Sequence, residues 1–68
     1  MATEVPLTYA LARKNGGEDW VRRDGDGNEV ASGTIAEADG GYVNLHFDRG
    51  GWTNTCHFDD IFLVVYDD

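Results

Sequence analysis

Glycine steps divide this chain into short segments, and they constrain its fold more than any other feature of the sequence. The chain has nine glycines and one proline in 68 residues. Gly-Gly or Asp-Gly steps stand at residues 16–17, 24–27, 40–41 and 50–51, where they mark turns. The segments between them have the length of β-strands. We therefore expect a single small domain over residues 1–68, mostly β, formed as a small antiparallel sheet or barrel of about five strands.

Residues 42–48 have the clearest strand pattern. Apolar and polar side chains alternate there, so that one face carries Val43, Leu45 and Phe47. This alternation is typical of a strand that rests one face on a core. The turn sequence Asp-Arg-Gly-Gly then leads to a second strand at residues 52–58, which predicts a hairpin.

The second strand of this hairpin alternates as well. One face would carry Trp52, Cys56 and Phe58. We expect Cys56 to be a buried small hydrophobic residue on that face. His57 is adjacent to Cys56, so in a strand it points to the opposite face and cannot act as the base of a thiol nucleophile. Trp52 either packs in the core or stays outside as an anchor for a partner, and both alternatives are open.

A third strand is expected at residues 28–38, so that residues 28–58 form a three-stranded meander. Val30 and Ile35 are five positions apart, and strict alternation would place them on opposite faces. Gly33 lies between them. A bulge at this glycine would bring both side chains inward.

The two ends of the chain supply the other elements. Residues 61–66 are apolar on both faces, which predicts a strand that is central and covered on both sides, or one that forms a subunit contact. Residues 19–23 form a further short strand. Residues 5–14 fit either a strand or a short N-terminal helix, and Thr8 and Tyr9 favour the strand.

Asp24, Asp26 and Asn28 stand at alternate positions, like the first ligands of an EF-hand loop. Counted from Asp24, however, the sixth residue is Glu29 instead of Gly, and the twelfth is Ile35 instead of Glu. The two features that close such a loop are missing. We interpret this stretch as the tip of a hairpin, where Asp and Gly suit a tight turn.

The sequence carries no phosphate loop, no nucleophile elbow and no dinucleotide fingerprint. Asp59 and Asp60 could form an acid–base pair, but they are more simply a turn between two strands. We therefore expect neither an enzyme nor a bound metal or cofactor. One lone cysteine fits a reducing compartment, and the first residues are not a signal peptide. The apolar run 61–66 is too short to span a bilayer, so we expect a cytoplasmic protein without membrane contact.

The net charge of −8 is distributed unevenly along the chain. Residues 24–68 contain ten acids against Arg49 alone, whereas residues 1–23 carry one net positive charge. Such a surface repels phosphate backbones, so direct binding of nucleic acid is not expected. A basic protein surface is the natural partner. Plain solubility and adaptation to salt are the alternatives.

The second half of the chain resembles the small SH3-like barrels of the KOW and Tudor kinds. The matching elements are a Gly-Thr-Ile strand (33–35), a V-x-L-x-F-D strand (43–48), a glycine turn, a further strand, and Asp-Asp-Ile before the last strand (59–61). The resemblance covers residues 28–66 and implies a barrel. It also implies an aromatic cage of the Tudor kind, to which Trp52 and Tyr42 would contribute. KOW-type domains meet RNA through basic loops, and this chain is acidic where those loops would be.

In size, in charge and in its lack of catalytic residues, the chain is also similar to anti-CRISPR and anti-restriction proteins of phages. This resemblance implies an inhibitor of the DNA-mimic type, which occupies a basic nucleic-acid-binding surface of a bacterial defence complex in the host cytoplasm. The acids at predicted turns and strand ends would bind the partner, with Trp52 as an aromatic anchor. These acids are Asp24, Asp26, Asp39, Asp48, Asp59 and Asp60. The alternative is an SH3-like assembly module that forms a homodimer through residues 61–66.

Overall fold

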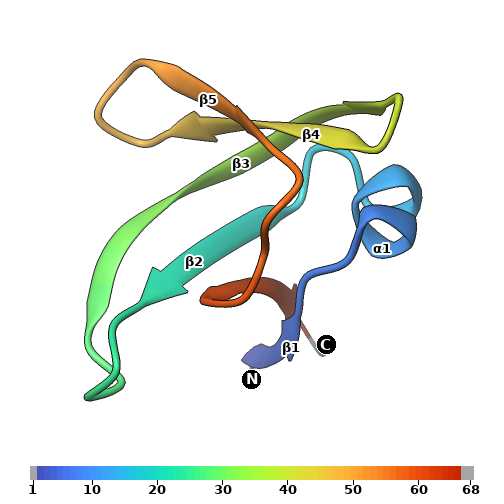
Figure 1. Ribbon diagram of the computed structural model, residues 1–68. Coiled ribbons are helices and arrows are strands. Elements are labelled where there is room, and N and C mark those ends of the chain that lie inside the picture. The colour runs from blue at the N-terminus through green and yellow to red at the C-terminus, as the bar shows by residue number, and fades with distance from the viewer. Residues whose placement is uncertain (1, 67–68) are drawn as a thin grey trace.

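Six antiparallel strands form one strongly curved sheet, in the order β1-β6-β2-β3-β4-β5, in the computed structural model of the protein (Figure 1). The structure describes residues 2–66. The elements are β1 (Ala2–Pro6), α1 (Tyr9–Lys14), β2 (Asp19–Arg23), β3 (Glu29–Asp39), β4 (Tyr42–Phe47), β5 (Trp52–Thr55) and β6 (Ile61–Tyr66). The predicted mostly-β fold is confirmed, the short N-terminal helix that the sequence left as an alternative is present, and the sheet has six strands where about five were expected.

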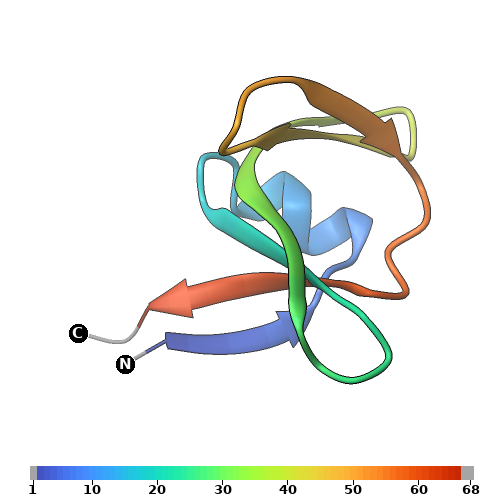
Figure 2. The same ribbon diagram turned by 90° about the vertical axis from the view of Figure 1, so that its left-hand side faces the viewer.

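Residues 9–14 form a helix, so the preference for a strand over the whole of 5–14 was wrong. Thr8 begins the helix: its backbone is extended, and its hydroxyl accepts a hydrogen bond from the amide of Leu11 at 3.2 Å. Ala12 is buried, and α1 packs against β3 and β4. The cap and this packing outweigh the weak strand preference of Thr8 and Tyr9. In Figure 2, α1 lies between β1 and β6 at one end of the sheet and β5 at the other.

The meander over β3, β4 and β5 is confirmed, and so are its turns. Gly40 and Gly41, between β3 and β4, have φ angles of 63° and 86°. Two successive residues with positive φ are what the tightest hairpin turns require, and glycine adopts them without strain. In the next turn, the amide of Phe47 donates to the carbonyl of Gly51 at 3.1 Å. The hairpin predicted for residues 42–48 and 52–58 therefore exists.

The bulge predicted at Gly33 is wrong. Gly33 pairs regularly with Trp20 on β2 and with Phe47 on β4, and the irregularities lie between Ile35 and Ala38 and between Arg22 and Arg23. Ile35 is buried, as expected, but Val30 is 54% exposed. The single-bulge prediction failed because β3 is long and pairs with two strands. Its first half pairs with β2 and its second half pairs with β4.

The faces predicted for β5 are reversed in the structure. Thr53 pairs with Leu45 and Thr55 pairs with Val43, and directly paired residues of antiparallel strands share a face. The two threonines therefore face the core. Trp52 is 64% exposed and Cys56, beyond the end of the strand, is exposed too. Core packing of Trp52 and burial of Cys56 are both excluded, because the pairing register with β4 overrides the apolar character of β5.

β6 is central, which was one of the two alternatives for residues 61–66, since it pairs with β1 on one side and with β2 on the other. Its inner face is buried through Ile61 and Leu63, whereas Phe62 and Val64 on the outer face are partly exposed. The strand is therefore fully covered on one face only. Because both of its edges are paired, a homodimer cannot form by strand pairing along β6.

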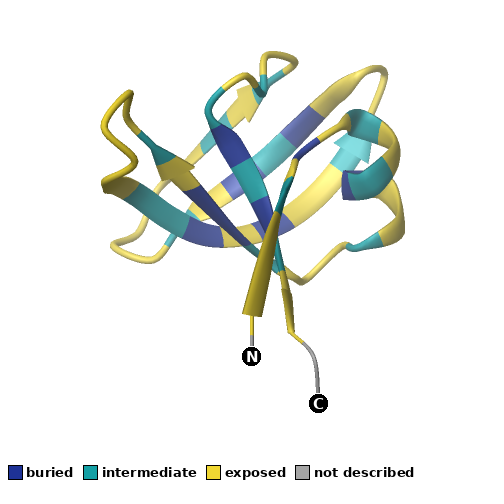
Figure 3. Ribbon diagram, turned by 90° about the horizontal axis from the view of Figure 1, so that it is seen from below, coloured by how far each residue is buried: buried dark blue, intermediate teal, exposed yellow. Residues whose placement is uncertain are grey.

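The core lies on the inner face of the curved sheet, around Trp20. Its indole packs edge-on against Phe47, with ring centres 5.3 Å apart. The indole nitrogen donates to the carbonyls of Thr34 and His46 at 3.2 and 3.1 Å. Figure 3 shows that buried segments lie along the strands and that the turns are exposed. The buried core residues are Leu7, Ala12, Trp20, Ile35, Val43, Leu45, Ile61 and Leu63. In residues 2–66, no helix is long and apolar enough to cross a membrane.

Candidate functional site

The turns and strand ends that carry the acids predicted to bind a partner lie at several corners of the molecule (Figure 1). Asp24 and Asp26 lie at the tip that precedes β3, and Asp39 is the last residue of that strand. A strand rises about 3.3 Å per residue, so the 11 residues of β3 separate the two ends by roughly 30 Å. The longest dimension of the whole molecule is 30 Å. These acids therefore do not form one binding rim.

The Asp24 carboxylate stabilises its own turn. Its Oδ1 atom accepts hydrogen bonds from the backbone amides of Asp26 and Asn28 at 2.9 and 3.0 Å. The interpretation of this stretch as a hairpin tip is confirmed. Within residues 2–66, no group of three or more His, Cys, Asp or Glu side chains is placed to hold a metal ion.

Asp59 and Asp60 form the predicted turn before β6. The Oδ2 atom of Asp60 accepts from Nε of Arg22 at 2.7 Å, and both side chains are about half exposed. The positive charge of Arg22 therefore partly neutralises the negative charge of Asp60. Asp59 remains exposed to solvent.

A group of acids gathers instead on the outer face of β2, β3 and β6, around the ring of Tyr66. Tyr66 donates a hydrogen bond of 2.5 Å from its hydroxyl to Oδ2 of Asp19. Ser32 donates from its hydroxyl to Oδ2 of Asp48 at 2.8 Å. A shallow hollow of about 250 Å³ between these side chains is also lined by Glu29 and Val64. We call this surface the acidic face, and it comprises Glu18, Asp19, Glu29, Asp48 and Tyr66.

The charge of this face acts on Tyr66. The hydrogen bond to Asp19 raises the pKa of the Tyr66 phenol, and desolvation and the negative charges of Asp19, Glu18 and Asp48 raise it further. The fold thus favours the protonated phenol. This contribution to stability is fully present below the ordinary tyrosine pKa of about 10, and it is lost as the pH rises through the raised value.

We expect Asp19→Asn to lower the pKa of Tyr66 toward its ordinary value, because the substitution removes both the charged acceptor and the nearest negative charge. The ultraviolet absorbance of tyrosinate measures this titration, and Tyr66→Phe identifies which of the three tyrosine steps belongs to Tyr66. Asp39→Asn, at the far end of β3, is the control and should leave the step in place. An unchanged Tyr66 step in Asp19→Asn would contradict the geometry described above.

An ion pair borders the acidic face. Arg23 donates from Nε and Nη2 to the two carboxylate oxygens of Glu4, at 2.7 and 2.6 Å. These hydrogen bonds lower the pKa of Glu4. Glu4 is on β1 and Arg23 on β2, so the pair crosses the outer face of β6, which lies between them. It ties the edge strand β1 to the rest of the sheet.

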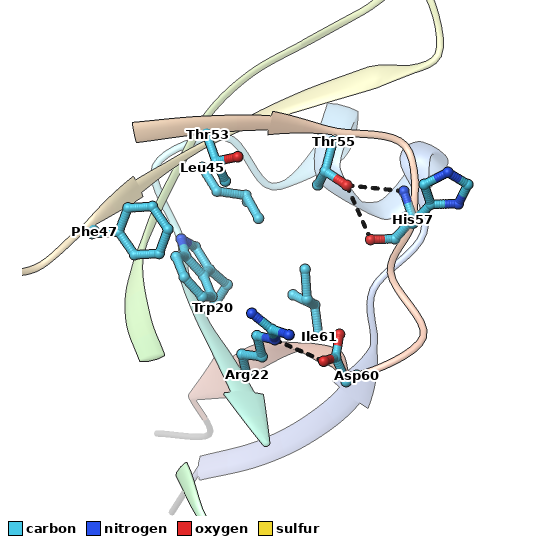
Figure 4. Close-up of a pocket in the computed structure, with 9 residues that line it drawn as sticks. All are labelled: Trp20, Arg22, Leu45, Phe47, Thr53, Thr55, His57, Asp60 and Ile61. Carbon is cyan, nitrogen blue, oxygen red and sulfur yellow. Dashed lines mark hydrogen bonds and ion pairs between the residues drawn. The ribbon is translucent and has the colours of Figure 1, made fainter. Parts of the chain in front are cut away.

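A second candidate site is a pocket of about 280 Å³ on the inner face, shown in Figure 4. Its apolar lining comes from Trp20, Leu45, Phe47 and Ile61, and its polar lining comes from Arg22, Thr53, Thr55, His57 and Asp60. The close-up places the threonines of β5 on one side of the pocket and the Arg22–Asp60 ion pair on the other. The hydroxyl of Thr55 bonds to the backbone of His57.

The aromatic cage implied by the Tudor resemblance is not assembled. Trp52 pairs with His46, whereas Tyr42 begins β4, four residues before His46. That spacing corresponds to about 13 Å along a strand. Both aromatic side chains are exposed, but they lie too far apart to enclose one cation.

Sequence reasoning found Asp48 but missed the other members of the acidic face and the inner pocket. Asp19 and Tyr66 are 47 positions apart, and no local pattern links them. Only the pairing of β2 with β6 brings them together. Comparisons of the chain with protein-family models, with curated proteins and with solved structures find no match.

Proposed function

We propose that this protein is a small binding module whose acidic face docks on a basic surface of a nucleic-acid-handling protein and inhibits it by occupying that surface. The observation that carries the proposal is the convergence of carboxylates from separate segments on one side of the sheet, around Tyr66. An inhibitor of the anti-CRISPR or DNA-mimic type would need such a surface.

The arrangement suits a basic partner for two reasons. Asp19 and Asp48 are each held by a hydrogen bond from a neighbouring hydroxyl, so they are positioned before binding and lose little conformational freedom on docking. Tyr66 is 58% exposed among them and can serve as an aromatic anchor. Opposed charge would speed association and select the partner.

Two of the partner-binding residues predicted from the sequence, Asp48 and Trp52, lie on the surface proposed here. Asp48 belongs to the acidic face. Trp52 is on the same outer surface of the sheet, because the pairs Asp19–Thr34, Thr34–His46 and His46–Trp52 form one row across four strands. The acids at the other turns, Asp24, Asp26, Asp39, Asp59 and Asp60, lie outside the acidic face and take no part in it.

The test compares two triple variants that carry the same charge. Glu18→Gln with Glu29→Gln and Asp48→Asn neutralises three of the four acids of the acidic face and keeps Asp19, the hydrogen-bond acceptor of Tyr66. Asp26→Asn with Glu37→Gln and Asp39→Asn neutralises three acids elsewhere. Each variant removes three carboxylates and so changes the net charge from −8 to −5. Tagged protein is used to capture partners from bacterial lysate at low and at high salt.

We expect the acidic-face variant to lose a captured nucleic-acid-binding protein that the control variant retains. Raised salt should weaken the capture by the unmodified protein, because exposed charges are screened. Equal loss in both variants would mean that overall acidity, and not this face, is responsible. Capture that survives in both would exclude the proposal and leave solubility as the explanation of the charge.

The alternative is an assembly module that forms a homodimer through the outer face of β6. The observation in its favour is that Phe62 and Val64 are only partly covered there. The same face carries the acids, so two copies would bring like charges together. Equilibrium sedimentation of the unmodified protein distinguishes the two functions, since a stable dimer would favour assembly.

A further inference from the structure

We infer that the free edge of β5 and the inner pocket beside it form a second binding site, which takes an extended segment of a partner protein. The segment would add to the sheet as an antiparallel strand and insert one apolar side chain into the pocket, with basic residues two positions before and after it on the same face. This site is on the opposite side of the sheet from the acidic face, and it does not depend on the function proposed above.

The first argument is the unpaired edge. β5 is the last strand of the sheet, and among residues 2–66 it pairs with β4 alone. Because the amide of Phe47 bonds to Gly51, the alternation of an antiparallel pair directs the backbone groups of Thr53 and Thr55 toward β4. The backbone groups of Trp52 and Asn54 are then directed to the free edge. Strand addition uses donors and acceptors of this kind.

The second argument is the pocket beside that edge. A residue placed opposite Thr53 on an added strand would lie on the same face as Thr53, which is the inner face. There it would enter the pocket of about 280 Å³ that Trp20, Leu45, Phe47 and Ile61 line. This volume is at the lower limit for small-molecule sites, so it suits a single side chain better than a cofactor.

β5 leaves this space open because it presents threonines where β4 presents Val43 and Leu45. A threonine reaches less far into the core than a leucine, and its hydroxyl disfavours close apolar packing. The pocket is therefore a consequence of the sequence of β5. An inserted apolar side chain would fill it and remove the surrounding apolar surface from water.

The third argument concerns charge and selects the partner. Asp60 lines the pocket with one carboxylate oxygen bound to Arg22, and Asp59 beside it is exposed. A second copy of this chain would bring a further net charge of −8 to the same edge. Basic residues two positions before and two positions after the inserted side chain would share its face. They could meet the exposed Asp59 carboxylate and the second oxygen of Asp60.

The experiment uses the synthetic peptide acetyl-Lys-Thr-Leu-Thr-Lys-amide as the probe, with binding measured by the backbone amide and tryptophan indole N–H chemical shifts of the protein. We expect shifts at Trp52 and Asn54 on the strand edge and at the Trp20 indole in the pocket. Replacing the central leucine of the peptide by serine should weaken binding by about tenfold or more, as loss of a central anchor does.

Backbone methylation of the peptide tests strand addition itself. The amides of the two threonines, which flank the leucine directly, would bond to β5, so methylating both should abolish binding. The amide of the central leucine points away from β5 in an antiparallel pair, so methylating it alone should preserve binding. Equal binding by the two methylated peptides would overturn the inference.

Protein variants test the pocket. Thr53→Leu fills it from within and should weaken binding by about tenfold or more, while keeping an apolar inner face that preserves the fold. Thr34→Leu makes the same change at an exposed position on the outer face of β3, away from the β5 edge, and should leave binding unchanged. The acidic-face triple variant should also bind the peptide normally. Undiminished binding by Thr53→Leu, or no binding of the unmodified peptide, would overturn the inference without bearing on the acidic face.

Discussion

Replacing Gly33 with alanine is expected to unfold the protein. An added Cβ atom would lie 1.6 Å from the carbonyl oxygen of His46, and 2.7 and 2.9 Å from the carbonyl carbon of His46 and Cα of Phe47. All three are backbone atoms of β4, so no side chain can rotate away to make room. The β3–β4 pairing would have to open at its centre, where the same His46 carbonyl also accepts the indole N–H of Trp20.

The expected loss is comparable with the whole stability of the fold. A domain of this length has a free energy of unfolding of roughly 3–10 kcal/mol, and opening the central strand pair would remove most of it. Circular dichroism and urea denaturation measure the effect. Gly25→Ala is the matched control, because its Cβ would meet nothing within 4 Å, and it should change stability by less than about 1 kcal/mol. A Gly33→Ala variant that unfolds at the urea concentration of the unmodified protein would show that β3 and β4 are not packed as described.

The second large effect is expected for Trp20→Ala, which should lower the free energy of unfolding by about 3–5 kcal/mol. Trp20 is 2% exposed and lies at the centre of the core. Its removal would leave a cavity, end the edge-on contact with Phe47, and leave the carbonyls of Thr34 and His46 without their indole donor.

Two further substitutions separate the causes. Trp20→Phe retains an aromatic ring but loses the N–H group, so it should fall between the unmodified protein and Trp20→Ala. Trp52→Ala removes the other tryptophan, which is 64% exposed, and should change stability by about 0.5 kcal/mol or less. The midpoint and slope of urea denaturation check all three. Equal destabilisation by Trp20→Ala and Trp52→Ala would contradict the assignment of Trp20 to the core and Trp52 to the surface.

The predictions that succeeded concerned local features of the chain. The turns at Gly40-Gly41 and at residues 48–51 and the hairpin tip at Asp24 were read from the sequence, whereas a central strand at 61–66 was one of two alternatives. Turn residues act over four positions at most, so their effect does not depend on the rest of the fold. The helix at Tyr9–Lys14 was left as an alternative, because its packing against β3 and β4 decides in its favour.

The predictions that failed concerned the relation between segments. The inner face of β5 was assigned from the apolar character of Trp52, Cys56 and Phe58, yet its register with β4 places Thr53 and Thr55 inside. The bulge assigned to Gly33 overlooked that one long strand pairs with two neighbours. A shift of a single residue exchanges the two faces of a strand, and the amino-acid pattern of one short strand does not determine it.

The same distinction holds for the candidate site. The sequence by itself determined an acidic, mostly-β domain with short strands and tight turns, because net charge and turn chemistry are properties of residues and their nearest neighbours. Only the tertiary structure decided which acids converge, since Asp19 meets Tyr66 and Asp48 meets Ser32 through strand pairings. It also decided that the threonines of β5 leave a pocket beside a free edge. Both surfaces depend on contacts between residues far apart in the chain, and strand order and register create those contacts.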